Sequence, residues 1–251
     1  MFRDTPVIAG GPDNRYTGSV RRLLLTLSLP LLTMLPSACE DDQEQATSPA
    51  PPPYPDPIAL ASPFVGSGGF GFHFGSAFAG ALFPQGLVKL GPDTKGPWGD
   101  FNSPLALFLH YSGYWYGDDT IVAFSHLHLH GTGATDYGVL GFMPLDGFDA
   151  GRIPPAGHQS PFRKETERAS PGRYQVTLDN GAIEVDLTAS AHVGRHRYRF
   201  PREATPFVLV DLTHHLSGGS IPFAEAWAKD GVIRGKFRHQ GGMSRGFGGY
   251  D

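Results

Sequence analysis

The chain has 251 residues, 18% of them charged, and a formal net charge of −4 at pH 7. A mildly acidic chain without a basic stripe is a poor candidate for nucleic-acid binding, and its length allows one large domain or two small ones. The 34 glycines and 23 prolines divide the apolar, β-branched and aromatic residues into short runs, which is typical of strands joined by turns rather than of long helices.

The first segment, residues 1–39, has the features of an export signal and is excluded from the predicted fold. Its apolar run, Leu23–Leu35, follows two arginines and is shorter than the roughly twenty residues of a membrane span. Cys39, the single cysteine, stands where a bacterial lipoprotein signal places its lipidated residue. We therefore expect a lipid at Cys39 and a periplasmic or cell-surface lipoprotein. Pro36 departs from the usual signal pattern, so cleavage without a lipid, followed by secretion, is the alternative.

Residues 40–57 are acidic at first and then rich in Ala, Pro and Ser. Such a composition cannot bury a core and favours extended polyproline geometry, so we expect a disordered linker. The lone cysteine also excludes a disulfide within the chain. The folded part is then predicted to span residues 58–251.

The folded part opens with a glycine-rich run, Gly66–Gly69. Neither a strand–loop–helix context nor a Walker lysine accompanies it, so we interpret it as a close approach of the backbone to a ligand or another domain rather than as a nucleotide site. The stretch Leu82–Thr94 predicts a strand closed by a turn at Pro92 and Asp93. Trp98 follows in a loop, where an indole is costly unless it packs or binds something.

Aromatic side chains are dense in the next segment. Four of them lie within six positions, namely Tyr111, Tyr114, Trp115 and Tyr116. Flat rings with a polar tip are the groups that pack against sugar faces or anchor interfaces. Asp118 and Asp119 follow, and paired aspartates in a glycine-rich stretch are mostly turn residues. The aromatic set therefore predicts a binding surface, and the aspartates are not assigned as catalytic acids.

Three histidines follow at alternate positions. Ile121–His130 is predicted as a strand, whose period of two puts His126, His128 and His130 on one face. Beyond a glycine-rich turn, Asp136 returns a carboxylate to the same end. A solvated strand face explains this pattern as well as a binding site does. A cupin-like metal site is the third interpretation, because histidines at i and i+2 can share one ion, although the segment lacks the glutamate that usually completes such a site.

The remaining chain predicts further strands. Alternation over Tyr174–Leu178 and again over Ile183–Leu187, around an Asp-Asn-Gly turn, predicts a hairpin with one buried face. His214 and His215 are interpreted as a turn at a strand end. The other predicted strands are Arg195–Phe200, Phe207–Leu212 and Val232–Arg238. The expected fold class is all-β, an antiparallel β-sandwich.

Four motifs occur in order along the folded part, namely Gly66-Ser67-Gly68-Gly69, Gly86–Thr94, Ser112-Gly113-Tyr114, and Phe124–Gly133 followed by Asp136-Tyr137-Gly138. In this order they resemble the amino-terminal domain of glycoside hydrolase family 92, and the resemblance covers most of residues 60–251. The stretch between Gly69 and Pro84 is a few residues longer than the family pattern. Phe72 stands where the family tends to have a histidine, and Gln85 replaces an aromatic residue. These departures indicate a divergent branch with altered substrate contacts.

The resembled enzymes are calcium-dependent, exo-acting α-mannosidases whose sandwich is of the supersandwich, galactose mutarotase-like type. Their catalytic carboxylates belong to a second, (α/α)6 helical domain, where most calcium ligands are also expected. This chain ends at Asp251 without long helical repeats. The resemblance therefore implies a carbohydrate-binding domain that forms one wall of a mannoside site and is inactive without the missing domain. No catalytic residue and no metal ligand is assigned within the chain.

Under this interpretation the partners are an α-mannoside or glycan and, through the lipid anchor, a membrane. The side chains predicted to contact the sugar are Trp98, Tyr114, Trp115, His126, His128 and Asp136. Two other functions stay open. One is a metal-dependent, cupin-like enzyme that uses the face of His126, His128 and His130, and the other is a non-catalytic binding module of a surface lipoprotein.

Overall fold

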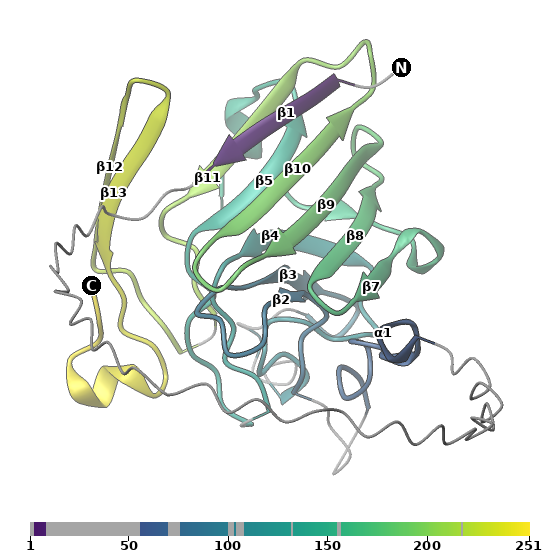
Figure 1. Cartoon of the computed structure of the whole chain (residues 1–251). Coiled ribbons are helices and arrows are strands. Elements are labelled where there is room, and N and C mark those ends of the chain that lie inside the picture. Colours follow the sequence, from purple (N-terminus) through teal and green to yellow (C-terminus); the bar gives the residue numbers. More distant parts are fainter. Residues whose placement is uncertain are drawn as a thin grey trace, which may run out of the picture. The chain divides into compact units, whose positions relative to one another are not determined.

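The computed structural model describes residues 3–8, 56–69, 76–99, 103, 108–131, 133–154, 157–216 and 218–251 (Figure 1). Cys39, Phe72 and the linker up to residue 55 lie outside the described residues. Arg3–Ile8, although part of the predicted export segment, forms strand β1 and pairs antiparallel with β10. None of the helices in these ranges has the length and apolar character needed to cross a membrane.

Two antiparallel sheets contain most of the strands. The first has the order β1-β10-β9-β8-β7, with bounds Arg3–Ile8, Gly194–Phe200, Ile183–Ala189, Arg173–Leu178 and Arg168–Ser170. The second has the order β11-β5-β4-β3-β2, with bounds Pro206–Asp211, Gly141–Asp146, Thr120–Ser125, Lys89–Lys95 and Ala81–Leu82, and β6 (Ser160–Pro161) pairs with β4. A separate hairpin consists of β12 (Phe223–Lys229) and β13 (Val232–Arg238). The helical elements are short, namely α1 (Pro57–Leu60) and 3₁₀ turns at Ala150–Arg152, Lys164–Thr166 and Ser244–Phe247. The expected all-β class is confirmed.

The hairpin of β8 and β9 follows directly from its alternating sequence. Six apolar side chains on one face are buried, namely Tyr174, Val176, Leu178, Ile183, Val185 and Leu187. They face one another in register across the two strands, and the polar residues between them are partly exposed. Burying each large apolar side chain contributes roughly 1.5–3 kcal/mol, so this face fixes both the register and the side that packs inward. The predicted hairpin is confirmed.

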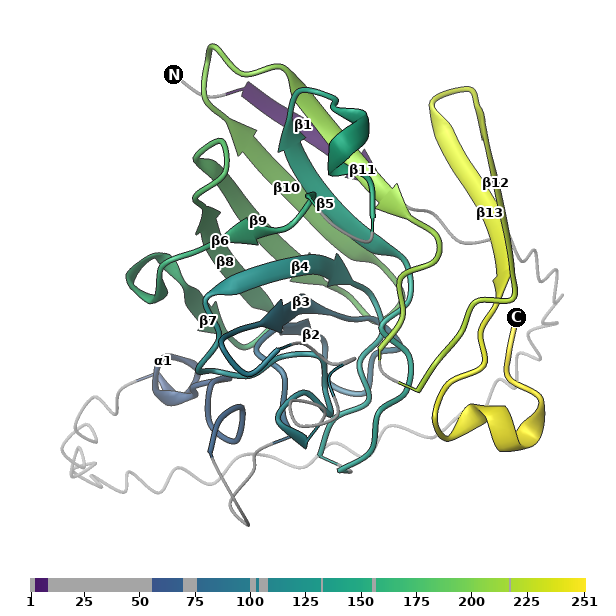
Figure 2. The same ribbon diagram turned by 180° about the vertical axis from the view of Figure 1, so that it is seen from behind.

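The core lies between the two sheets. One continuous cluster of buried side chains contains Phe124, Met143 and Leu145 from β4 and β5 together with Tyr198 and Phe200 from β10. Because both sheets contribute to the same cluster, they pack face to face as a β-sandwich. Figure 2 shows β2, β3 and β4 crossing in front of β8 and β9.

Pro92 and Asp93 do not form the predicted turn. Both lie inside β3, where Pro92 faces Phe124 in register, and the register with β4 shifts between Asp93 and Thr94. An irregularity of this kind tolerates a proline, which cannot donate to the ladder. The expectation of a turn was wrong because the Pro-Asp pair is used at a bulge, which brings the Asp93 carboxylate into the interior.

The predicted strand Ile121–His130 is too long. Strand β4 ends at Ser125, and beyond it the returning chain is joined by an isolated bridge from His128 to Tyr137 and by single backbone hydrogen bonds rather than by a regular ladder. The returning residues Tyr137, Gly138 and Leu140 have φ angles of 65°, 67° and 60°. These left-handed values do not occur in a regular strand, so the ladder cannot continue past β4.

Candidate functional site

His126 and His128 have different polar partners, and His128 and His130 both pack against the Phe78 ring. His126 Nε2 lies 3.1 Å from His196 Nε2 on β10, and His128 Nε2 lies 3.0 Å from Asp93 Oδ1. His130 packs edge-on against the ring of Phe78. Across the part of the chain that the structure describes, no group of three or more His, Cys, Asp or Glu side chains is placed to hold a metal ion. The described residues therefore give no support to a cupin-like centre.

Asp93 is the centre of a buried polar network. Its side chain has no exposed surface, and its Oδ2 lies 2.7 Å from His214 Nε2 while Oδ1 contacts His128. Ser125 Oγ lies 3.2 Å from the same His128 nitrogen. The network therefore ties β3 to the segments that follow β4 and β11, which are far apart in the sequence.

The hydrogen bonds of His128 indicate what each of its ring nitrogens does as donor or acceptor. Nδ1 lies 2.7 Å from the carbonyl oxygen of Lys89, which only accepts, so Nδ1 donates. Nε2 faces the carboxylate of Asp93, which only accepts, so a proton on Nε2 would be donated to Asp93. Burial raises the pKa of Asp93, but the charges and hydrogen bonds of His128 and His214 outweigh it and hold that pKa far below its usual range. Asp93 is thus an ionised carboxylate with a structural role.

A second buried carboxylate, Asp118, holds the loop that carries the aromatic residues. Its Oδ2 accepts a hydrogen bond from Thr94 Oγ1 at 2.6 Å and lies 2.5 Å from His110 Nε2. Thr94 Oγ1 in turn accepts from the backbone N–H of Trp115 at 3.1 Å. Because Thr94 follows Asp93 in β3, one strand positions both networks. Asp118 was interpreted from the sequence as a turn residue, and the structure makes it a core residue.

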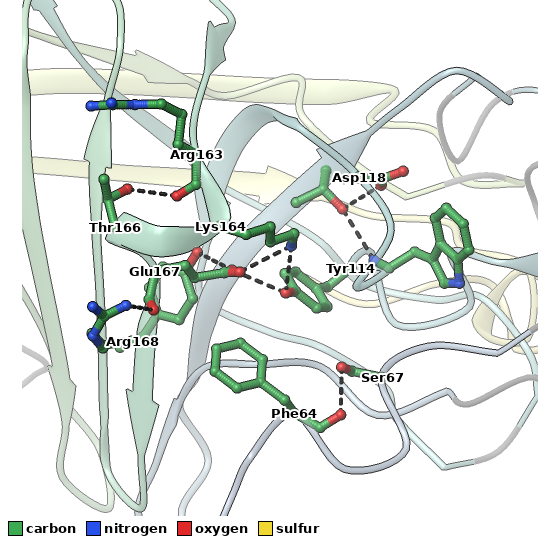
Figure 3. Close-up of polar contacts among 12 residues, drawn as sticks. Phe64, Ser67, Tyr114, Asp118, Arg163, Lys164, Thr166, Glu167 and Arg168 are labelled. Carbon is green, nitrogen blue, oxygen red and sulfur yellow. Dashed lines mark hydrogen bonds and ion pairs between the residues drawn. The ribbon is translucent and has the colours of Figure 1, made fainter.

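Tyr114 lies beneath the surface. Its ring is fully buried, and its hydroxyl donates to Glu167 Oε1 at 3.0 Å (Figure 3). Lys164 Nζ donates to Glu167 Oε2 at 2.9 Å and to the Tyr114 hydroxyl at 3.1 Å, and it lies over the rings of Tyr114, Tyr116 and Phe162. Burial, together with the negative charge of Glu167, raises the pKa of Tyr114, so the phenol stays a donor. This cluster anchors the aromatic loop to the 3₁₀ turn Lys164–Thr166.

Two aromatic side chains near these networks are accessible to solvent. Trp98 is 50% exposed, and Trp115 is partly exposed with its Nε1 donating to the carbonyl oxygen of Gly69 at 3.2 Å. Gly96, two residues before Trp98, packs so closely on Asp118 that a Cβ there would lie 2.4 Å from Oδ1. The loops of Trp98 and Trp115 therefore meet at Asp118.

The six predicted contact residues thus separate into two groups. Trp98 and part of Trp115 are accessible at the surface. The other four contact protein groups in this structure, namely Tyr114, His126, His128 and Asp136. Asp136 is 3% exposed and accepts from the backbone N–H groups of Tyr137 and Ser244, each at 2.8 Å.

Sequence reasoning did not find Asp93, His110 or His214 as members of the site. No local pattern marks the two histidines, because their partners are distant in the chain or in another element. Asp93 had one usable signal, since an aspartate inside an otherwise buried run needs a partner to offset its desolvation. The turn propensity of Pro-Asp hid that signal.

The buried carboxylates do not fit a calcium site. Asp93 faces two imidazoles, and Asp118 faces an imidazole and a hydroxyl that donates to it. Calcium takes about six to eight oxygen ligands, and these carboxylate oxygens already accept hydrogen bonds. No calcium-dependent step is therefore derived for these residues.

Gly113 leaves no room for a side chain beside Asp93. Its φ is 82°, and a Cβ there would lie 2.0 Å from Asp93 Oδ1. We expect Gly113→Ala to lower the free energy of unfolding by more than about 2 kcal/mol, because left-handed alanine costs roughly 1 kcal/mol and the carboxylate must also move. Gly147→Ala is the matched control, since Gly147 has a φ of 75° and no atom within 4 Å of its Cβ position. Urea unfolding should find the larger loss for Gly113→Ala, and equal losses would contradict the tight packing.

Residues 60–250 match the family model of the glycosyl hydrolase family 92 N-terminal domain. The structure is similar to that of a family GH92 α-mannosidase from Bacteroides thetaiotaomicron in complex with mannoimidazole, with a TM-score of 0.63 and 28% identity over 73% of this chain and 23% of that chain. It is also similar to the gh92 family glycosyl hydrolase ccman5, with a TM-score of 0.60 and 28% identity over 73% of this chain and 24% of that chain.

A curated sequence, described as an uncharacterized secreted glycosidase of Arthroderma benhamiae, is 26% identical over 152 residues. The match covers 55% of this chain and 18% of that protein. The chain therefore spans about a quarter or less of the length of these relatives.

Proposed function

Because this chain belongs to the glycosyl hydrolase family 92 N-terminal domain family, we propose that it recognises carbohydrate and forms one wall of a sugar-binding cleft. The observation that carries the proposal is the pair of accessible indoles, Trp98 and Trp115, on loops that meet at the buried Asp118. An aromatic face stacks on the C–H face of a sugar ring, and polar groups beside it bind the hydroxyls.

The Trp115 indole is held in place before a ligand arrives. Thr94 Oγ1 accepts from the Trp115 backbone and donates to Asp118, and Trp115 Nε1 is bonded to Gly69. A preordered surface loses less side-chain freedom on binding, which favours affinity. Tyr114 anchors the Trp115 loop through its hydrogen bonds with Glu167 and Lys164. Direct contact of Tyr114, His126, His128 and Asp136 with a sugar stays a prediction.

We propose an α-mannoside as the sugar. The matched structure from Bacteroides thetaiotaomicron is an α-mannosidase bound to mannoimidazole, which supports this choice of ligand. The chain spans 23% of that enzyme, so the proposal for the chain itself is limited to recognition of the mannoside. The secreted glycosidase among the relatives supports a proposal of export, with a lipid at Cys39 or plain secretion as its two forms.

We further propose that the catalytic acid and base come from a helical domain outside the residues described. Glycoside hydrolysis generally uses two carboxyl groups on either side of the scissile bond. The buried carboxylates of the described residues, namely Asp93, Asp118, Asp136 and Glu167, all accept hydrogen bonds from protein donors. None of them is therefore free to protonate a leaving group or to activate a water.

We expect the purified chain to release no free mannose from α-linked mannobiose in the presence of calcium. General acid or base help is worth roughly a hundred- to ten-thousandfold each, so the loss of both leaves turnover below ordinary detection. Binding of methyl α-mannoside is expected to be weak, and Trp98→Ala should weaken it by about two- to tenfold through the lost ring contact. Calorimetry and chromatography of the products check the two parts.

Trp227→Ala is the matched control, because Trp227 on β12 is 49% exposed, close to the 50% of Trp98. Equal affinities of Trp98→Ala and Trp227→Ala would remove Trp98 from the proposed wall. Steady release of mannose that Asp118→Asn or Asp136→Asn abolishes would show that this domain carries its own catalytic carboxylate.

A further inference from the structure

His239 and Tyr250 bury polar atoms that have no hydrogen-bond partner among the described residues. Both ring nitrogens of His239 and the hydroxyl of Tyr250 are in this state, and the His239 side chain has no exposed surface. Each such atom costs about 1–3 kcal/mol if it stays unpaired in the interior. Native proteins keep few of them, so their gathering at one place points to a hydrogen-bonding group that binds there.

One of the unpaired atoms lies beside the carboxylate of Asp136, and the Tyr250 ring packs next to it. His239 Nδ1 lies 3.6 Å from Asp136 Oδ1, which is too far for a hydrogen bond. The rings of His239 and Tyr250 are 4.9 Å apart, and those of Tyr137 and Tyr250 are 5.4 Å apart. Burial lowers the pKa of His239, so its ring is mainly neutral at neutral pH, with one nitrogen as donor and one as acceptor. The place thus combines a carboxylate, a neutral imidazole and a phenol.

This set of groups fits hydroxyl groups better than ions. A hydroxyl both donates and accepts, and so do the neutral imidazole and the phenol around Asp136. An anion would be repelled by Asp136. A divalent cation would find one carboxylate and one imidazole where it needs about four or more ligands.

The segment 241–249 covers Asp136. Ser244 donates its backbone N–H to Asp136 Oδ2 at 2.8 Å and its hydroxyl to Oδ1 at 3.3 Å. A Cβ on Gly241 would lie 1.7 Å from Oδ1, so only glycine allows this approach. Five of the nine residues in the segment are glycine. The segment has two large apolar side chains, Met243 and Phe247, and that of Phe247 is 93% exposed. Apolar packing of these side chains therefore contributes little to holding the segment closed.

We propose that Asp136, His239 and Tyr250 form a binding site for adjacent hydroxyl groups of a sugar, and that the segment 241–249 is a cover that moves away when the sugar binds. In the covered state, Ser244 supplies to Asp136 the two donors that the sugar hydroxyls supply in the open state. The identity of the sugar as a mannoside rests on the proposed function, whereas the site itself rests on the buried atoms.

The test follows the ring nitrogens of His239 by nuclear magnetic resonance while methyl α-mannoside is added to the full chain. We expect the His239 resonances to shift in the unmodified protein. Ser244→Ala, which removes one donor of the cover, should bind the mannoside about two- to tenfold more tightly, because the closed state competes less well for Asp136. Asp136→Asn and the milder Tyr250→Phe should both weaken binding.

Ser190→Ala is the matched control, because the hydroxyl of Ser190 lies in an exposed turn and bonds to Val193. Its affinity should equal that of the unmodified protein. Backbone spectra of each variant establish that it is folded, and Tyr250→Phe, which removes a hydroxyl alone, decides the question if Asp136→Asn does not fold.

The outcomes separate this site from the proposed function. One possible result is that Trp98→Ala weakens mannoside binding, that Ser244→Ala and Tyr250→Phe leave it unchanged, and that the His239 resonances do not shift. This result contradicts the proposed site at Asp136 and leaves the proposal of carbohydrate recognition intact. If neither the unmodified protein nor Ser244→Ala binds the mannoside, the proposed function falls. The same titration with sorbitol then decides the site: shifted His239 resonances support a site for another polyol, and unchanged ones overturn it in favour of bound water.

Discussion

Replacing Asp93 by asparagine is expected to lower the free energy of unfolding by about 3–5 kcal/mol, the range for removing one side of a buried ion pair. The carboxylate receives His128 on one oxygen and His214 on the other, and all three side chains are buried. An asparagine offers one acceptor and two donors, so its amide N–H group would face an imidazole N–H. His128 Nε2 would also lose its carboxylate partner.

Urea unfolding followed by tryptophan fluorescence measures this loss. Asp230→Asn is the matched control, because it makes the same chemical change at an exposed turn residue with a φ of 53°, which asparagine tolerates. That control should change the free energy of unfolding by less than about 0.5 kcal/mol. A loss below about 1 kcal/mol for Asp93→Asn would mean that the network relaxes around a neutral residue and that Asp93 does not hold the site together.

Acidification from pH 7 to pH 4 is expected to lower the free energy of unfolding by about 3 kcal/mol through the pair of His126 and His196. Burial lowers the pKa of His126 to about 4, against 6.5 in the unfolded chain, and burial also lowers the pKa of His196. Below pH 6.5 the unfolded state therefore binds a proton that the folded state does not bind. The free energy of unfolding falls as the pH falls for this reason. Each pKa unit corresponds to about 1.4 kcal/mol.

The two rings cannot be counted separately. Their Nε2 atoms lie 3.1 Å apart, so one nitrogen donates to the other, and a proton added to the accepting nitrogen breaks this bond. Asp93 does not contribute in this window, because its lowered pKa makes its stabilisation complete above about pH 4. The loss assigned to this pair is therefore separate from the contribution of Asp93.

Chemical unfolding at a series of pH values checks this expectation. His126→Gln removes one titrating ring and should flatten the dependence of stability on pH between 4 and 6.5. His192→Gln is the matched control, since His192 is exposed in the turn between β9 and β10. If His126→Gln and the unmodified protein show the same slope, the acid sensitivity lies elsewhere.

Much of the sandwich could be predicted from the amino-acid sequence. The alternation over Tyr174–Leu178 and Ile183–Leu187 predicted a hairpin and its buried face, and β8 and β9 match it. Val232–Arg238 was predicted as a strand with the bounds that β13 has. Such patterns suffice because a strand with one buried face repeats every two residues, so neighbouring side chains carry the information. The ordered glycine and histidine motifs likewise sufficed to indicate the family that the domain match establishes.

The polar interior was decided only by the tertiary structure. Asp93 meets His214 from 121 positions away, and Asp136 meets Ser244 from 108 positions away, so no local period contains either pair. The sequence predicted a turn at Pro92 and Asp93 from their turn propensity. That prediction was wrong because the free energy gained by pairing the buried Asp93 carboxylate with two imidazoles exceeds the preference of these residues for a turn. The strand through His126 and His128 was predicted too long for a related reason: left-handed residues in the returning chain, at Tyr137 and Leu140, ended the ladder and sent each ring to a different partner.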